Sequence, residues 1–131
     1  MSSSNQIWIK STSFEVEEDE DSETNKGIYG KALAQWLASK LKENGEKVVD
    51  VIAEDWGRCI LLKEKPPTFI GCANRWGETT EWGLFVEVKE GLLKGLFGGG
   101  SSGDEVRRLE ALLEKILRGA EEVDEFIVDP N

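Results

Sequence analysis

Four consecutive stretches in the middle of the chain are rich in apolar residues and are separated by short polar turns. These stretches are Lys47–Ala53, Arg58–Lys63, Thr68–Asn74 and Glu81–Val88. Short apolar runs that turn residues bound on both sides are typical of strands, and a polar turn around Gly77 separates the last two of them. Pro66 and Pro67 end the second strand, because proline cannot donate a hydrogen bond into a ladder. The pattern therefore predicts a curved antiparallel meander over Val48–Val88.

A different period flanks the meander on both sides. Apolar residues recur at steps of three and four from about Gly27 to Asn44, and again from about Asp104 to Arg118. This spacing predicts an amphipathic helix in each range. Asn44 and Gly45 supply the left-handed residue that commonly follows a last helical turn. Ser102 and Glu105 fit the S-x-x-E capping box at the start of the second helix.

Two weaker strands and three irregular segments complete the prediction. Strands are expected at Gln6–Val16 and Glu125–Val128, with a short apolar segment at Leu92–Phe97. The fold class is α+β: strand, helix, four-stranded antiparallel meander, helix and short strand, with two helices packed on one face of a curved sheet. We expect a single domain over residues 1–131, with a flexible tail at 1–5, an acidic loop at 15–24 and a Gly/Ser loop at 98–103. This element order resembles the TATA-binding-protein-like topology.

Acidic residues outnumber basic ones by 26 to 16, which gives a net charge of −10. The acids are densest between Glu15 and Glu23, where like charges repel and an exposed loop is expected. This balance argues against nucleic acid and anionic membrane as partners, because phosphate binding requires a basic surface. It permits a basic protein partner through electrostatic steering. The simpler interpretation is that the acids keep the protein soluble.

Scarce residue types exclude several chemistries. The absence of histidine removes Ser-His and Cys-His nucleophile systems. Two cysteines, Cys59 and Cys72, are too few for a structural zinc site, and no metal or cofactor is predicted. No apolar run approaches the roughly 20 residues of a membrane span, and the start MSSSNQIWIK lacks the pattern of a signal peptide. We therefore expect a cytoplasmic protein with free thiols.

Both faces of the predicted meander carry large apolar side chains. In the strand Glu81–Val88, Trp82 and Leu84 point to one face and Phe85 points to the other. A sheet with one face in water alternates more cleanly, and two helices on one side bury only one face. Part of the second face is therefore expected to be covered by a ligand, by a partner subunit such as a second copy in a homodimer, or by the Leu92–Phe97 segment.

Three Trp-Gly pairs punctuate the meander, each at the end of a strand. If the turns at one end of the sheet cluster, the indole rings could line a ligand pocket together with nearby polar groups. The candidate ligand-binding residues are Trp56, Arg58, Asn74, Arg75, Trp76 and Trp82. The alternative is purely structural, with tryptophans that cap the ends of the core and glycines that relieve the turns.

The groups that would make an enzyme are incomplete. Either cysteine would need a basic neighbour to lower the pKa of its thiol, and no second catalytic group is identifiable. Carboxylates at two turns, Glu54 with Asp55 and Glu78 with Glu81, could pair as acid and base or hold Ca²⁺ or Mg²⁺. Solvated turn acids are the default, so no catalytic residue and no metal ligand is predicted.

The stretch Asn25–Leu37 (NKGIYGKALAQWL), followed by Glu54–Gly57 and Glu81–Gly83, is similar to a set of small, uncharacterised bacterial proteins. The resemblance implies a bacterial origin and no mechanism. Small acidic α+β proteins also include toxin-neutralising immunity proteins, which is a likeness of class. The favoured function is a non-enzymatic interaction module that binds a protein partner, as inhibitors and immunity proteins do. The alternatives are a small-molecule-binding domain with a Trp/Arg-lined cleft and, third, an enzyme that uses carboxylates or a cysteine.

Overall fold

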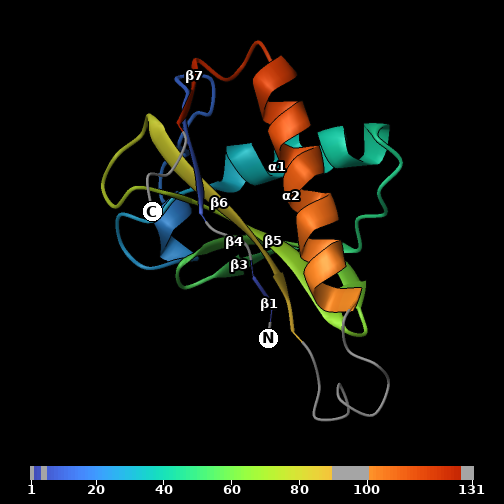
Figure 1. The fold of residues 1–131 in the computed structure, drawn as a ribbon. Helices are drawn as coiled ribbons and strands as arrows, with labels where there is room; N and C mark the ends of the chain where they lie inside the picture. Colours follow the sequence, from blue (N-terminus) through green and yellow to red (C-terminus); the bar gives the residue numbers. More distant parts are fainter. Residues whose placement is uncertain (1, 4–5, 90–100, 128–131) are drawn as a thin grey trace.

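The computed structural model describes residues 2–3, 6–89 and 101–127, and in them seven strands form one antiparallel sheet (Figure 1). The strands are β1 (Ser2–Ser3), β2 (Ile7–Lys10), β3 (Asp50–Glu54), β4 (Gly57–Glu64), β5 (Pro67–Asn74), β6 (Glu81–Val88) and β7 (Glu125–Ile127). Their order across the sheet is β3-β4-β5-β6-β2-β7, and β1 pairs with β6. The predicted meander is thus confirmed as β3 to β6.

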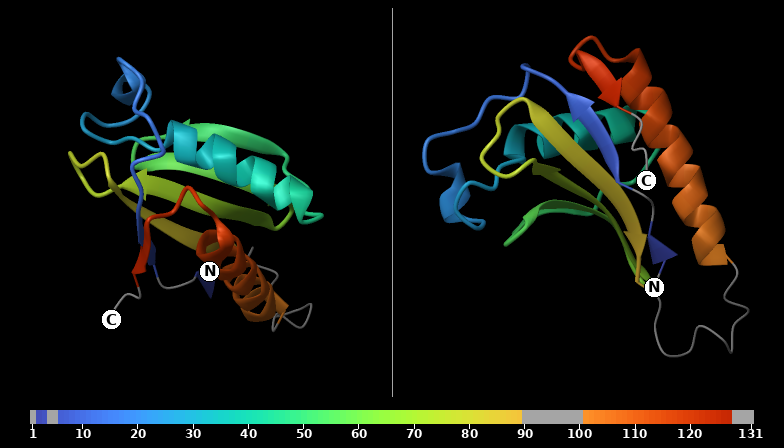
Figure 2. Two further views of the ribbon diagram at one scale, coloured as in Figure 1. Left: turned by 90° about the horizontal axis from the view of Figure 1, so that it is seen from above. Right: turned by 60° about the vertical axis from the view of Figure 1, so that its left-hand side comes forward.

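Helices α1 (Lys31–Glu43) and α2 (Ser101–Gly119) pack against the same face of the curved sheet (Figure 2). Leu37 of α1 and Leu109 of α2 are fully buried in one core. The strands contribute alternate residues to this core, as Ile70 of β5 and Leu84 of β6 show. The predicted α+β class, with both helices on one face, is confirmed.

Helix α1 begins four residues later than predicted and ends where the sequence places its stop. Gly30 has a φ of +150°, and a Cβ on it would lie 2.9 Å from the carbonyl oxygen of Cys72, so the chain before Lys31 is not helical. At the other end Gly45 has a φ of +86°, and the N–H of Glu46 donates to the carbonyl of Leu41 at 2.9 Å. This is the geometry of a Schellman stop.

The acidic segment 15–24 is not the wholly exposed loop that like-charge repulsion predicts. It contains a short 3-10 helix, η1 (Glu20–Ser22), and the side chain of Glu20 is buried. Oε2 of Glu20 accepts the N–H groups of Gly30 at 2.8 Å and Lys31 at 3.0 Å. A carboxylate at a helix N-terminus satisfies unpaired N–H groups and complements the helix dipole. One acid of the run therefore caps α1 instead of facing water.

The first strand is shorter than the predicted Gln6–Val16. The chain leaves the sheet after Lys10 and places Phe14 in the core, where its ring centroid lies 5.2 Å from that of Trp36 in α1. The apolar residues after Lys10 therefore serve the core from a loop. The predicted tail also differs, because β1 pairs Ser2 with Val88, beyond the part of β6 that β2 occupies.

The start of α2 differs from the predicted Gly/Ser loop and capping box. The helix begins at Ser101, so Ser102 lies within its first turn and not before it. Extending an existing helix costs little, because each added residue gains one hydrogen bond. The predicted apolar segment Leu92–Phe97 and residues 98–100 lie outside the described residues.

Candidate functional site

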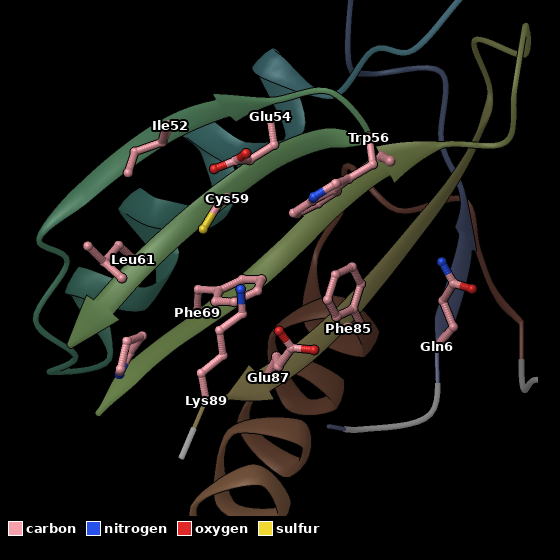
Figure 3. A pocket seen from close by; sticks show the side chains of 12 residues that line it. Gln6, Ile52, Glu54, Trp56, Cys59, Leu61, Phe69, Phe85, Glu87 and Lys89 are labelled. Atoms are coloured by element: carbon pink, nitrogen blue, oxygen red, sulfur yellow. The ribbon is translucent and has the colours of Figure 1, made fainter. Parts of the chain in front are cut away.

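The face of the sheet opposite the helices contains a hollow of about 570 Å³, which we call the open-face hollow (Figure 3). Side chains from β3, β4, β5 and β6 line it, because alternate residues of each strand point away from the helices. Eight of its twelve lining residues are apolar or cysteine, and the polar ones are Gln6, Glu54, Glu87 and Lys89. Within the described part of the chain, no helix or strand covers this surface.

Three aromatic rings pack together in the open-face hollow. The ring centroid of Trp56 lies 6.2 Å from that of Phe69 and 5.4 Å from that of Phe85, and the two phenyl rings meet edge to face at 6.0 Å. Gly71 provides the space for Phe85, because a Cβ on Gly71 would overlap Cε1 of that ring. Side chains on neighbouring strands thus shield each other from water where no helix does.

Charged groups and one thiol share the hollow with these rings. Nζ of Lys89 lies 5.6 Å from the ring centroid of Phe69, within the range of a cation–π contact. Burial raises the pKa of the Cys59 thiol to about 11, and the carboxylate of Glu54 adds to the rise, while Lys89 opposes it. Cys59 is therefore a protonated thiol near neutral pH and a poor nucleophile.

The open face continues from the hollow toward β2. The ring of Trp8 lies against Gly83, where a Cβ would be 2.9 Å from Cζ3 of the indole. The guanidinium of Arg75 stacks over Trp8 at 4.5 Å from the ring centroid, and its Nε lies 3.4 Å from Oε2 of Glu81. Trp8 is thus a second aromatic ring that packs over a glycine of β6. Together with Arg75 it extends the aromatic surface of the open face toward β2.

The six sequence-predicted site residues do not gather at one place. Trp56 lines the open-face hollow, and Arg75 stacks on the same face beside it. Trp82 is buried in the core below the helices, and its Nε1 donates to the carbonyl of Ser11 at 3.2 Å. Trp76 is 73% exposed in its turn, and its Nε1 donates to the carbonyl of Lys26.

The remaining two predicted residues, Arg58 and Asn74, are buried and hold the loop that precedes α1. Oδ1 of Asn74 accepts the N–H of Tyr29 at 2.8 Å, and its Nδ2 donates to the carbonyl of Gly27 at 3.0 Å. Nη2 of Arg58 lies 3.4 Å from Oε1 of Glu23. The contacts of both side chains thus fasten the N-terminal loop to the sheet, on the side away from the hollow. Their predicted role in ligand binding stays a prediction.

The two cysteines lie on adjacent strands and on opposite faces of the sheet. Cys59 is opposite Gly71, and Cys72 is opposite Arg58, so alternation sends one thiol into the hollow and the other into the core. Burial raises the pKa of Cys72 as well. Neither thiol has the lowered pKa of a reactive cysteine. No cluster of three or more potential metal-ligating acids or cysteines occurs among the described residues.

Of the residues that line the hollow, the predicted site contained Trp56 alone, and Phe69, Phe85 and Glu87 are among those it missed. Two features of the sequence could have identified them. The strands carry apolar residues at both sets of alternate positions, and a glycine lies on the neighbouring strand. Gly71 is directly opposite Phe85 in the β5–β6 register. A glycine beside an aromatic residue allows the ring to lie across the strand.

Comparison with known proteins adds no relative to this description: no family model, no curated protein and no solved structure matches the chain. Among the described residues, no helix combines the length and the apolar character that crossing a membrane requires. The functional assignment therefore depends on the geometry of the open face.

Proposed function

We propose that this protein is a non-enzymatic interaction module that holds a protein partner on the open face of its sheet. The observation that carries the proposal is an apolar surface centred on Trp56, Phe69 and Phe85, on the side of the sheet opposite both helices. Exposed apolar patches that are rimmed by polar groups commonly mark interaction sites. Trp56 is 38% exposed, and tryptophan is the residue type most enriched among binding hot spots.

The charges around this surface favour a basic partner. Glu54 and Glu87 line the hollow with one counter-charge, Lys89, and the whole chain carries a net charge of −10. Complementary charge raises the rate of encounter and disfavours acidic partners. An inhibitor or immunity-like role for a basic target fits this surface. The proposal keeps the cytoplasmic setting expected from the sequence, where Cys59 and Cys72 would remain thiols.

A small-molecule ligand is the second candidate, and the size of the hollow favours it. A volume of about 570 Å³ lies within the usual range of ligand pockets, roughly 300–1,000 Å³. The Trp/Arg-lined cleft expected from the sequence would then be replaced by an aromatic floor with Glu54 and Glu87. A rise or fall in tryptophan fluorescence with a metabolite that Trp56→Ser abolishes would support this candidate over the first.

The matched pair Trp56→Ser and Trp76→Ser tests the main proposal. Both tryptophans lie in Trp-Gly turns and are exposed, but only Trp56 lines the hollow. In affinity capture from the source cells at low salt, we expect wild type and Trp76→Ser to recover the same partner. Trp56→Ser should recover at least about tenfold less, as for a hot-spot residue. Equal recovery by Trp56→Ser would contradict the proposal.

A further inference from the structure

Strand β3 forms one outer edge of the sheet in the described part of the chain. Among the described strands, β3 pairs with β4 alone. The two-residue hairpin closes on the pair Glu54 and Gly57, and hydrogen-bonded pairs alternate along an antiparallel ladder. The N–H and C=O groups of Val51 and Ala53 therefore point away from β4. In agreement with this direction, the N–H of Val51 donates to Oδ1 of Asp50 at 2.8 Å.

Strand β3 is short and carries two acids, Asp50 and Glu54, but it lacks the other devices that protect a sheet edge. Its five residues, DVIAE, contain no proline and no lysine, and its register with β4 shows no bulge. Val49 and Ile52 are 44% and 37% exposed beside it, and with Trp56 they account for three of the four exposed large hydrophobic side chains in the described part of the chain.

The open-face side chains of β3 form a short pattern of acid, apolar residue and acid. Asp50, Ile52 and Glu54 are exposed and share one parity, while Val51 packs toward the core. Ile52 and Glu54 also line the open-face hollow (Figure 3). A strand added at this edge would place its own alternate side chains beside these three residues.

We propose that β3 binds an extended segment of a basic protein partner as an additional strand of the sheet. The segment would read basic, any, apolar, any, basic. Its apolar side chain would contact Ile52 at the rim of the hollow, and its two cations would lie beside Asp50 and Glu54. In strand addition, main-chain hydrogen bonds supply affinity and alternate side chains supply specificity. This inference rests on the proposed function and names the partner's chemistry and its mode of binding.

A second copy of the chain fits this edge less well. In antiparallel pairing of two β3 strands centred on Ile52, Asp50 would lie opposite Glu54 of the second copy, and the same clash would occur twice. Like charges directly opposite each other destabilise a strand pair. Charge complementarity therefore selects a foreign basic segment over self-association.

The test uses a capped peptide, Thr-Lys-Thr-Phe-Thr-Lys-Thr, whose palindromic sequence presents the same pattern in either strand direction. Binding to the full chain is measured by calorimetry in about 20 mM salt, where charge attraction is little screened. The variant Ala53→Pro removes an outward N–H and leaves the ladder with β4 intact. We expect it to weaken binding at least about tenfold while the circular dichroism spectrum and the urea midpoint stay close to those of wild type.

A charge exchange provides the second readout. The double variant Asp50→Lys with Glu54→Lys should lose the lysine peptide and bind Thr-Glu-Thr-Phe-Thr-Glu-Thr, with about the affinity of the original pair. Absence of binding in both pairings would overturn strand addition, as would a wild-type chain that dimerises without peptide. Binding that Trp56→Ser weakens and Ala53→Pro does not would also overturn it, while leaving the proposed function intact. The proposed function itself is tested separately, by comparing partner capture between the Trp56→Ser and Trp76→Ser variants.

Discussion

The two faces of this sheet are made by alternate residues of the same strands, yet they differ in what surrounds them. On β6, Leu84 is fully buried under the helices, while its neighbour Phe85 lines the open-face hollow. Polar residues on the covered face, such as Asn74, are used to fasten the loop before α1. Polar residues in the hollow, such as Glu87, instead border an accessible surface. The covered face therefore supports the fold, while the open face stays accessible in the described part of the chain.

Neighbouring truncations on β6 should show the largest difference between the faces. Leu84→Ala removes a fully buried side chain and should lower the free energy of unfolding by about 3 kcal/mol, within the usual range of roughly 2–5. Phe85→Ala should cost about half as much, because this ring is partly exposed and water can enter the space it leaves. Urea denaturation of both variants measures the difference, and equal costs would contradict it.

Gly71 should be coupled to Phe85 on the open face. In wild type, Gly71→Ala places a methyl group into the ring of Phe85 and should cost about 2 kcal/mol, as overpacking does. In a Phe85→Ala background the same substitution should be nearly neutral. A double-mutant cycle from urea denaturation gives the coupling free energy. A cost that is the same in both backgrounds would show that the ring does not lie over Gly71.

The polar anchors of the covered side can be tested at Glu20. Glu20→Ala leaves the N–H groups of Gly30 and Lys31 without their buried acceptor and should lower the free energy of unfolding by about 1–2 kcal/mol. Glu18→Ala is the matched control from the same acidic run, because its side chain is exposed, and it should change stability little. If both variants cost the same, Glu20 is one more solvated acid.

The rate at which the Cys59 thiol is alkylated reports on its surroundings in the open-face hollow. The raised pKa of this thiol does not change the stability of the protein near neutral pH. Because its pKa is raised to about 11, alkylation by iodoacetamide in a Cys72→Ser variant should accelerate about tenfold per pH unit from pH 8 to about pH 10. The folded state holds this proton more tightly than the unfolded state. Its contribution to stability is therefore complete below about pH 9 and is lost as the pH rises through about 11. A rate that levels off near pH 8.5 would contradict the raised pKa.

The sequence alone predicts the elements with strong periodicity. The bounds of β6 agree with the predicted strand Glu81–Val88, and the stop after α1 follows from Gly45. Glu20 could not be assigned, because a single buried carboxylate inside an acidic run has no local pattern. Its role depends on a helix start ten residues away.

The candidate site was less predictable than the fold for a related reason. The three Trp-Gly pairs look alike in sequence, but Trp82 lies on the covered parity of β6, Trp56 at a hairpin tip beside the hollow, and Trp76 in an exposed turn. The face that a side chain occupies depends on register and on helix placement, which short motifs do not contain. In contrast, the sequence does show that both sets of alternate strand positions carry apolar residues. This pattern predicts that part of the sheet face opposite the helices is covered.

The most direct measurement of the difference between the faces is a magnetic resonance titration of isotope-labelled protein with Thr-Lys-Thr-Phe-Thr-Lys-Thr. Tryptophan indoles report on both sides of the sheet, with Trp56 beside the hollow and Trp82 in the core. We expect the amide of Ala53 and the indole of Trp56 to shift, while the indoles of Trp36 and Trp82 stay unchanged. Shifts confined to α1 and α2, with β3 and Trp56 unaffected, would contradict recognition on the open face.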